Sequence, residues 1–255
     1  MNEDYILEVI DVRKRFGGVI ALDGVNLKVK RGSMTALIGP NGSGKTTLFN
    51  VIAGVYKPDS GKVIFDGTDI TGWPPEKIYH RGLVRTFQVP RMFKGMTVFE
   101  NVLTAAKGNP GEKFTTSPLR RIWKEFELKI AEKAIDIMEL LKILHVARNL
   151  SSAISGGQMK LVELARGLMS DPKMLLLDEP AAGVNPTLAH NIFSFLRQLN
   201  REQGISMLII EHRLDILFDY VDYVYVMHRG KVVAQGTPEE IIENPVVIDI
   251  YLGEA

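Results

Sequence analysis

Residues 39–46 read Gly39-Pro40-Asn41-Gly42-Ser43-Gly44-Lys45-Thr46. A glycine, four residues and then Gly-Lys-Thr is the spacing of a phosphate-binding loop. The apolar run from Met34 to Ile38 predicts a strand before the loop, and residues 47–53 predict a helix after it. In such a loop the backbone N–H groups attract phosphate oxygens, the lysine contacts the β and γ phosphates, and the threonine hydroxyl binds Mg²⁺. The alternative is a glycine-rich turn that only joins strand to helix.

A second apolar run ends in two acidic residues. Residues 174–177 are Met-Leu-Leu-Leu, and Asp178 and Glu179 follow. If the run is a buried strand, both carboxylates lie at the edge of the sheet where open α/β folds bind ligands. Asp178 suits a contact with Mg²⁺ through water, and Glu179 suits polarising a water that attacks a phosphate. The alternative interpretation is a pair of acids that caps the segment beginning at Pro180.

A third motif, Ser155-Gly156-Gly157-Gln158, precedes a helical pattern that continues to Asp171-Pro172. Serine is a favoured helix N-cap, and the two glycines leave the helix end open to an anion. Taken alone, the motif is more typical of a capped helix after a flexible turn.

The composition excludes several classes of protein. Among 255 residues, 31 Lys and Arg against 30 Asp and Glu give a net charge of +1, so we expect no nucleic-acid partner. The absence of cysteine excludes disulfides, thiolate metal sites and a cysteine nucleophile. The longest unbroken apolar run, Tyr223 to Met227, is far shorter than the roughly 18 to 20 residues of a membrane-spanning helix. The N-terminus lacks the features of a secretory signal, so we expect a cytoplasmic protein.

The pattern along the chain predicts one α/β domain with helices inserted between its halves. Up to residue 71, short β-rich runs alternate with turn pairs, and from Pro172 onward apolar runs alternate with helical patterns. Between them, Thr97-Val98-Phe99-Glu100 predicts a capping box, and apolar residues recur at helical spacing from Trp123 to Leu144. We expect residues 1–88 and 168–255 to form the nucleotide-binding core and residues 89–167 a helical subdomain. Residues 107–118 predict an exposed loop.

The order of these motifs resembles that of ATP-binding subunits of ABC transporters, and the resemblance covers nearly the whole chain. The motifs are the phosphate loop, Gln88, the Ser155 segment, the acid-tipped strand, and His212 after the apolar run 205–210. The resemblance implies a P-loop NTPase core with a mixed sheet, an N-terminal antiparallel β subdomain and an inserted α-helical subdomain. It also implies ATP and Mg²⁺ as cofactors.

The resemblance further implies a role for each motif. Phe16 would stack on adenine, Gln88 would sense the γ-phosphate and Mg²⁺, and His212 would hold the γ-phosphate and orient the water. The Ser155 segment would complete the ATP site of a partner subunit. The implied ATP-binding residues are Phe16, Gly39, Pro40, Asn41, Gly42, Ser43, Gly44, Lys45, Thr46 and Thr47, with Ser155, Gly156, Gly157 and Gln158 serving the partner's site. The implied catalytic residues are Glu179, His212 and Gln88, and the implied Mg²⁺ contacts are Thr46, Gln88 and Asp178.

Finer features are similar to the group that energises import of branched-chain amino acids. They are residues 84–88 (Val-Arg-Thr-Phe-Gln), residues 96–101 (Met-Thr-Val-Phe-Glu-Asn) and the ending Tyr-Leu-Gly-Glu-Ala. The chain departs from the general pattern at Ile154, where leucine is usual, at Asn185, where an acid is common, and at Arg213 after His212. An amide at Asn185 does not supply the negative charge of the usual acid.

The resemblance implies integral membrane permease subunits, a second identical or related ATPase subunit, and a solute-binding protein as an indirect partner. It places the chain in the cytoplasm, peripheral on the inner face of the cell membrane. Residues Arg91, Met92 and Phe93 are expected to dock the permease, or alternatively to pack a helix joint. The other functions considered are an ABC ATPase of DNA repair or translation, an exporter subunit, and a nucleotide-gated dimerisation module without turnover.

Overall fold

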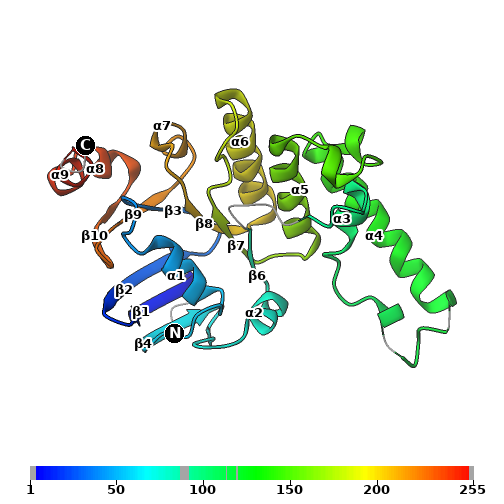
Figure 1. The fold of residues 1–255 in the computed structure, drawn as a ribbon, viewed down its shortest axis with the longest axis horizontal. Coiled ribbons are helices and arrows are strands. Elements are labelled where there is room, and N and C mark those ends of the chain that lie inside the picture. Colours follow the sequence, from blue (N-terminus) through cyan, green and yellow to red (C-terminus); the bar gives the residue numbers. More distant parts are fainter. Residues whose placement is uncertain (1–3, 87–91, 113, 119, 253–255) are drawn as a thin grey trace. The chain divides into compact units, whose positions relative to one another are not determined.

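The computed structural model describes residues 4–86, 92–112, 114–118 and 120–252 of the chain. Its contacts divide the chain into two compact units. The first unit comprises Met1–Arg85, Lys173–Ala182 and Ala189–Ala255, and the second comprises Thr86–Pro172 and Gly183–Leu188. Figure 1 shows strands and helices in the first unit and mainly helices in the second.

An antiparallel sheet begins the first unit. It contains β1 (Tyr5–Phe16), β2 (Val19–Lys30), β4 (Ser60–Phe65) and β5 (Thr68–Asp69), in the order β2-β1-β4-β5. Gly17, at a φ of 57°, lies in the turn between β1 and β2, where a left-handed backbone suits glycine. Within β2, residues 25–29 alternate apolar and polar side chains, whereas residues 19–24 do not show continuous alternation.

The second sheet of this unit is mixed and has the strand order β10-β9-β3-β8-β7-β6. β3, β6, β7, β8 and β9 pair in parallel, whereas β10 is antiparallel to β9. All residues of β3, β7 and β8 are buried, which explains why their sequences are apolar runs without alternation. The strands are β3 (Met34–Ile38), β6 (Leu83–Arg85), β7 (Met174–Asp178), β8 (Ser206–Ile210), β9 (Tyr223–His228) and β10 (Lys231–Gly236).

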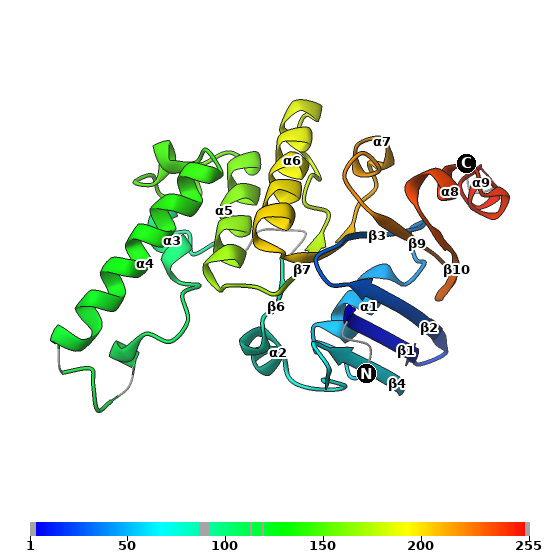
Figure 2. The same cartoon turned by 180° about the vertical axis from the view of Figure 1, so that it is seen from behind.

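Helix α1 (Lys45–Ile52) packs between the two sheets, as Figure 2 shows. Its apolar side chains Leu48, Phe49 and Ile52 join the same core as residues from both sheets. The helix is therefore fixed on two sides, and so is the loop that precedes it. The other helices of this unit are α2 (Pro75–Arg81), α7 (Leu214–Leu217), α8 (Pro238–Ile242), α9 (Pro245–Leu252) and residues 189–203 of α6 (Pro186–Gln203).

The second unit is built on α3 (Val98–Leu103), α4 (Arg120–Leu140) and α5 (Gly156–Met169), which pack on one another. Short 3₁₀ turns lie at Pro110–Glu112, Leu144–Val146 and Ser151–Ala153. The predicted capping box at Thr97 is present, with the Glu100 N–H donating to the threonine hydroxyl at 3.2 Å. The periodicity predicts a helix up to Leu144, but α4 ends at Leu140 and Lys142 has a left-handed φ of 56°.

The predicted fold class is confirmed: a mixed sheet, an N-terminal antiparallel sheet and an inserted helical segment. Among the described residues, none of the helices combines the length and the apolar character needed to cross a bilayer.

Candidate nucleotide site

The loop between β3 and α1 has a backbone that only glycine tolerates at two positions. Gly39 has a φ of +144°, and a Cβ there would lie 2.1 Å from the carbonyl oxygen of Met227 on β9. Gly44 has a φ of +104°, and its Cβ would lie 2.5 Å from the carbonyl oxygen of Ala21. The loop is thus wedged between neighbouring strands, and its shape depends on the absence of these side chains.

The N-terminus of α1 is open to an anion. Gly44 is the N-cap and supplies no side-chain hydrogen bond, and the first turn carries no acidic residue. The first backbone N–H groups of a helix have no partner inside the helix, and the helix dipole makes this end attractive to negative charge. Thr46 is exposed there, while Ser43 is buried. These features fit a phosphate group.

Lys45 lies folded into the loop. Its ammonium donates to the carbonyl oxygens of Gly39 at 2.6 Å and Pro40 at 2.9 Å, and the residue is only 6% exposed. Burial lowers the pKa of Lys45, and the negative charges of Glu179 and Asp178 offset part of this effect. The loop carbonyls therefore hold a cation beside the open helix end.

Asp178, at the end of β7, forms a buried ion pair that sequence reasoning missed. The Arg85 guanidinium donates to its carboxylate at 2.9 Å, with side-chain exposures of 10% and 6%. The same guanidinium donates to the Asn50 side-chain oxygen at 2.6 Å and lies 5.8 Å from the centre of the Phe49 ring. Asn50 and Phe49 belong to α1, so Arg85 joins the acid-bearing strand to the helix that follows the phosphate loop.

Glu179 and His212 lie together, after β7 and β8 respectively. The Glu179 carboxylate oxygen Oε1 is 3.3 Å from Nε2 of His212. Glu179 has a left-handed φ of 52°, and its N–H donates to the Ile210 carbonyl at 2.9 Å, which extends the β7–β8 pairing by one residue. The side chain is 18% exposed and that of His212 is 45% exposed. A partly exposed carboxylate thus sits on a left-handed backbone just after the strand, and such backbone strain is common at functional sites.

Phe16 ends β1 and is 43% exposed. Its ring meets Tyr56 edge-on at a centroid distance of 5.2 Å, and the Lys14 ammonium lies 5.5 Å from its centre. Tyr56 could not be recognised from the sequence, because an isolated tyrosine after a helix carries no periodic signal. An exposed, supported aromatic ring is suited to stacking on a base.

In the second unit, Ser155 caps α5 as predicted. The Gln158 N–H donates to the serine hydroxyl at 3.3 Å, and the Ser155 N–H donates to the Gln158 side chain at 2.9 Å. A Cβ on Gly156 would meet no atom within 4 Å, whereas one on Gly157 would lie 2.7 Å from Leu188 Cδ2. Gly156 thus leaves the helix end open, and Gly157 allows a close approach of α6.

Asn185 accepts a hydrogen bond from the Leu188 N–H at 2.8 Å in the first turn of α6. An amide oxygen performs this capping as well as a carboxylate oxygen does. Of the other predicted residues, Gln88 and Arg91 lie outside the described residues.

The oxygen donors of Thr46 and Asp178 fit Mg²⁺, which prefers hard oxygen ligands. Among the described residues there is no group of three or more His, Cys, Asp or Glu placed to hold a metal. Mg²⁺ in nucleotide sites is usually bound by one or two protein side chains together with the phosphates, and the Thr46 hydroxyl and the Asp178 carboxylate are donors of this kind.

These features agree with comparisons with known proteins. Residues 22–182 match the family described as "ABC transporter", and the chain belongs to that family. Residues 231–255 match a second description, "Branched-chain amino acid ATP-binding cassette transporter".

Relatives align over nearly the full length. A "Probable branched-chain amino acid transport ATP-binding protein LivG" of Methanocaldococcus jannaschii is 49% identical over 98% of both chains. A "High-affinity branched-chain amino acid transport ATP-binding protein BraF" of Pseudomonas aeruginosa is 39% identical over 98% of both chains. A crystal structure of an ABC transporter cassette in its ADP conformation superposes with a TM-score of 0.85 at 47% identity, covering 98% of this chain and 99% of that one.

Proposed function

We propose that this chain binds and hydrolyses ATP to drive import of branched-chain amino acids through a separate membrane permease. The observation that carries the proposal is the contact between Glu179 and His212. The same unit contains the proposed phosphate loop, in which the Lys45 ammonium donates to the Gly39 carbonyl. The similarity to LivG and BraF over nearly the whole chain supports the choice of solute.

In this proposal the loop backbone and Lys45 bind the β and γ phosphates. The ammonium leaves its two carbonyl partners, Gly39 and Pro40, for phosphate oxygens when nucleotide enters. The Thr46 hydroxyl and the Asp178 carboxylate would hold Mg²⁺, with Gln88 as a further contact. When bound, Mg²⁺ neutralises charge on the phosphates. Phe16 stacks on the adenine.

Glu179 orients and polarises the water that attacks the γ-phosphate. His212, at 3.3 Å, holds the Glu179 carboxylate in place and offers its ring to the γ-phosphate. The two side chains act together, because a carboxylate on a strained turn needs a partner to fix its rotamer.

Two further parts of the proposal concern partners. A second ATPase subunit brings its open α5 end, from Ser155 to Gln158, to the γ-phosphate held by this chain. The surface that includes Arg91, Met92 and Phe93 docks the permease, so the subunit is peripheral on the cytoplasmic face of the membrane. A solute-binding protein acts indirectly through the permease.

Replacing Glu179 by glutamine tests the catalytic step. The amide keeps size and hydrogen bonding but removes the base, so hydrolysis should fall by about 10²-fold or more while ATP affinity persists. Phosphate release and ATP binding are measured on the same preparation, with Glu76→Gln, an exposed acid on α2, as the matched control. If Glu179→Gln released phosphate at the rate of the control, Glu179 would not be the residue that activates the water.

The solute is tested separately by uptake. Cells that lack the gene for this chain should lose uptake of labelled leucine, and the unaltered chain should restore it where Glu179→Gln does not. Normal leucine uptake in the absence of the chain would contradict import of branched-chain amino acids but leave the ATPase assignment standing.

A further inference from the structure

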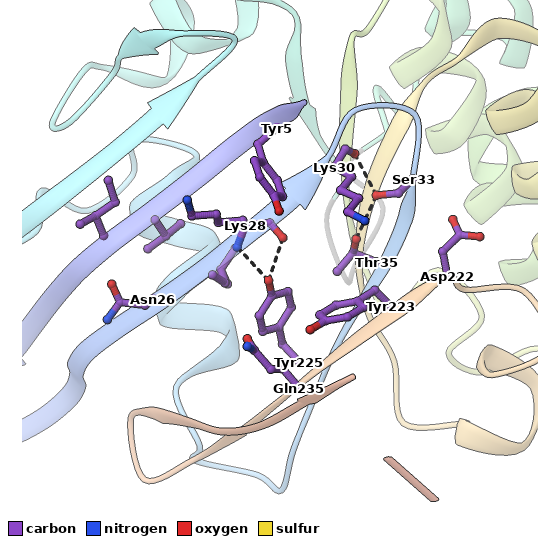
Figure 3. A pocket seen from close by; sticks show the side chains of 13 residues that line it. Tyr5, Asn26, Lys28, Lys30, Ser33, Thr35, Asp222, Tyr223, Tyr225 and Gln235 are labelled. Carbon is purple, nitrogen blue, oxygen red and sulfur yellow. Dashed lines mark hydrogen bonds between the residues drawn. The ribbon is translucent and has the colours of Figure 1, made fainter. Parts of the chain in front are cut away.

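The first unit contains a pocket of about 650 Å³ that is lined by residues of β1 and β2 and by residues of β3, β9 and β10 (Figure 3). This volume lies in the range of sites for small organic molecules. No residue of the phosphate loop lines it, nor do Phe16, Asp178, Glu179 or His212. The pocket is therefore separate from the proposed nucleotide site.

Three tyrosines, Tyr5, Tyr223 and Tyr225, form part of the pocket wall. The Tyr225 hydroxyl accepts from the Lys28 N–H at 3.0 Å and donates to the Lys28 carbonyl at 2.9 Å, which locks the ring against β2. Tyr223 packs edge-on against Tyr225 at 5.3 Å, and Tyr5 closes another side. Burial raises the pKa of both Tyr223 and Tyr225, so both phenols stay neutral. The pocket thus offers ready-made aromatic surface.

The charges that line the pocket do not cancel. Asp222 is neutralised by Arg197, which donates to its two oxygens at 2.6 and 2.9 Å, and Lys28 pairs with Glu8 at 2.9 Å. Lys30 makes no ion pair with any residue in the described part of the chain.

Lys30 lines the pocket and is exposed. Its carbonyl is held by the Ser33 hydroxyl at 2.8 Å, and in Figure 3 its side chain runs toward Thr35 and Tyr223. The uncompensated charge of the lining is therefore a single cation beside aromatic rings.

We propose that this pocket binds a small aromatic carboxylate, with its ring among Tyr5, Tyr223 and Ile10 and its carboxylate on Lys30. The apolar floor of Val9 and Leu27 accepts the body of the ligand. A neutral aromatic compound would leave Lys30 without a counter-charge. An aliphatic dianion would make no ring contacts, and its second negative charge would have no cation in the lining. An aromatic monoanion satisfies both features of the lining.

The probe for this site is naphthoate, and naphthamide is its neutral counterpart of the same shape. Both are titrated into the full chain saturated with ADP and Mg²⁺, so that the nucleotide site is occupied. Amide NMR spectra report where each probe binds, and the resonances of Lys28, Ser33 and Gln235 should shift. We expect naphthoate to bind more tightly than naphthamide.

Lys30→Met removes the charge but keeps the length of the side chain, and should weaken naphthoate by about fivefold, the size of a partly exposed charge interaction. It should leave naphthamide unchanged. Lys62→Met, an exposed lysine on β4 outside the pocket, is the matched control and should have no effect. Tyr223→Leu, checked for folding by circular dichroism, should weaken both probes because it removes ring contact.

Four results would overturn the proposal, and the first three concern where and how the probes bind. They are equal affinity for the acid and the amide, undiminished naphthoate binding in Lys30→Met, and shifts confined to resonances of the phosphate loop. Absence of saturable binding up to about 10 mM would do so as well, since even a weak ligand of this size saturates in that range. None of these results bears on ATP hydrolysis, so the proposed function is tested independently.

Discussion

Replacing Arg85 by methionine tests the buried connection between β6, β7 and α1. In the native chain the guanidinium donates to Asp178 at 2.9 Å and to Asn50 at 2.6 Å. Methionine keeps the apolar stem but removes both donors, and the Asp178 carboxylate, in a residue only 4% exposed, loses its cation. Removing one partner of a buried ion pair typically costs about 3–5 kcal/mol, and we expect the free energy of unfolding to fall by about that amount.

Urea unfolding measures this loss. The chain has two tryptophans, Trp73 in the first unit and Trp123 in the second, so a Trp123→Phe background lets fluorescence report on the first unit alone. Arg31→Met is the matched control, because its ion pair with Asp66 at 2.8 Å is half exposed and should contribute at most about 1 kcal/mol.

A double variant, Arg85→Met with Asp178→Asn, distinguishes the loss of the ion-pair energy from the cost of leaving the Asp178 carboxylate buried without a cation. Removing both charges should recover part of the stability lost in Arg85→Met, because no unpaired carboxylate stays buried. The reasoning is refuted if Arg85→Met costs no more than Arg31→Met, or if the double variant is less stable than the single one.

Three other predictions concern the proposed nucleotide contacts. Phe16→Ala should weaken ATP and ADP by a similar factor, worth about 1–3 kcal/mol, since both share adenine; calorimetry showing loss for only one of them would contradict stacking. Gly39→Ala should abolish ATP binding in the same assay because its Cβ has no room, whereas Gly18→Ala, with no atom within 4 Å of the new Cβ, should bind normally. Ser155→Ala should lower the unfolding free energy of the second unit by about 1 kcal/mol, and an unchanged urea midpoint would show that the cap is not stabilising.

The features that the sequence predicts well are those set by neighbouring residues. The turn from β3 into α1 follows from glycine spacing between a strand and a helix, and the Ser155 cap follows from its glutamine three residues later. The buried strands β7 and β8 follow from apolar runs. In each case the signal and the structure occupy the same few residues.

Contacts between distant residues were not predictable from the sequence. Arg85 lies on a three-residue strand that is too short for a periodic signal, and its partner Asp178 is 93 residues away. Tyr225 reads as part of an apolar run, yet its hydroxyl binds Lys28, 197 residues distant, and helps to build the pocket. Such pairs depend on the order of strands in the sheets, which composition and spacing do not determine.

The position of Arg85 along the chain has a mechanical consequence. β6 is the last strand of the first unit before the chain passes into the second unit at Thr86. A force applied to the chain at Thr86 pulls directly on β6. This strand has only three residues, so its backbone hydrogen bonds alone hold it weakly. The Arg85 side chain adds two rigid attachments, one to the strand that bears Asp178 and one to the helix behind the phosphate loop. A load on the crossing therefore reaches the strand of Asp178 and the helix after the proposed phosphate loop through this guanidinium as well as through the β6–β7 backbone pairing.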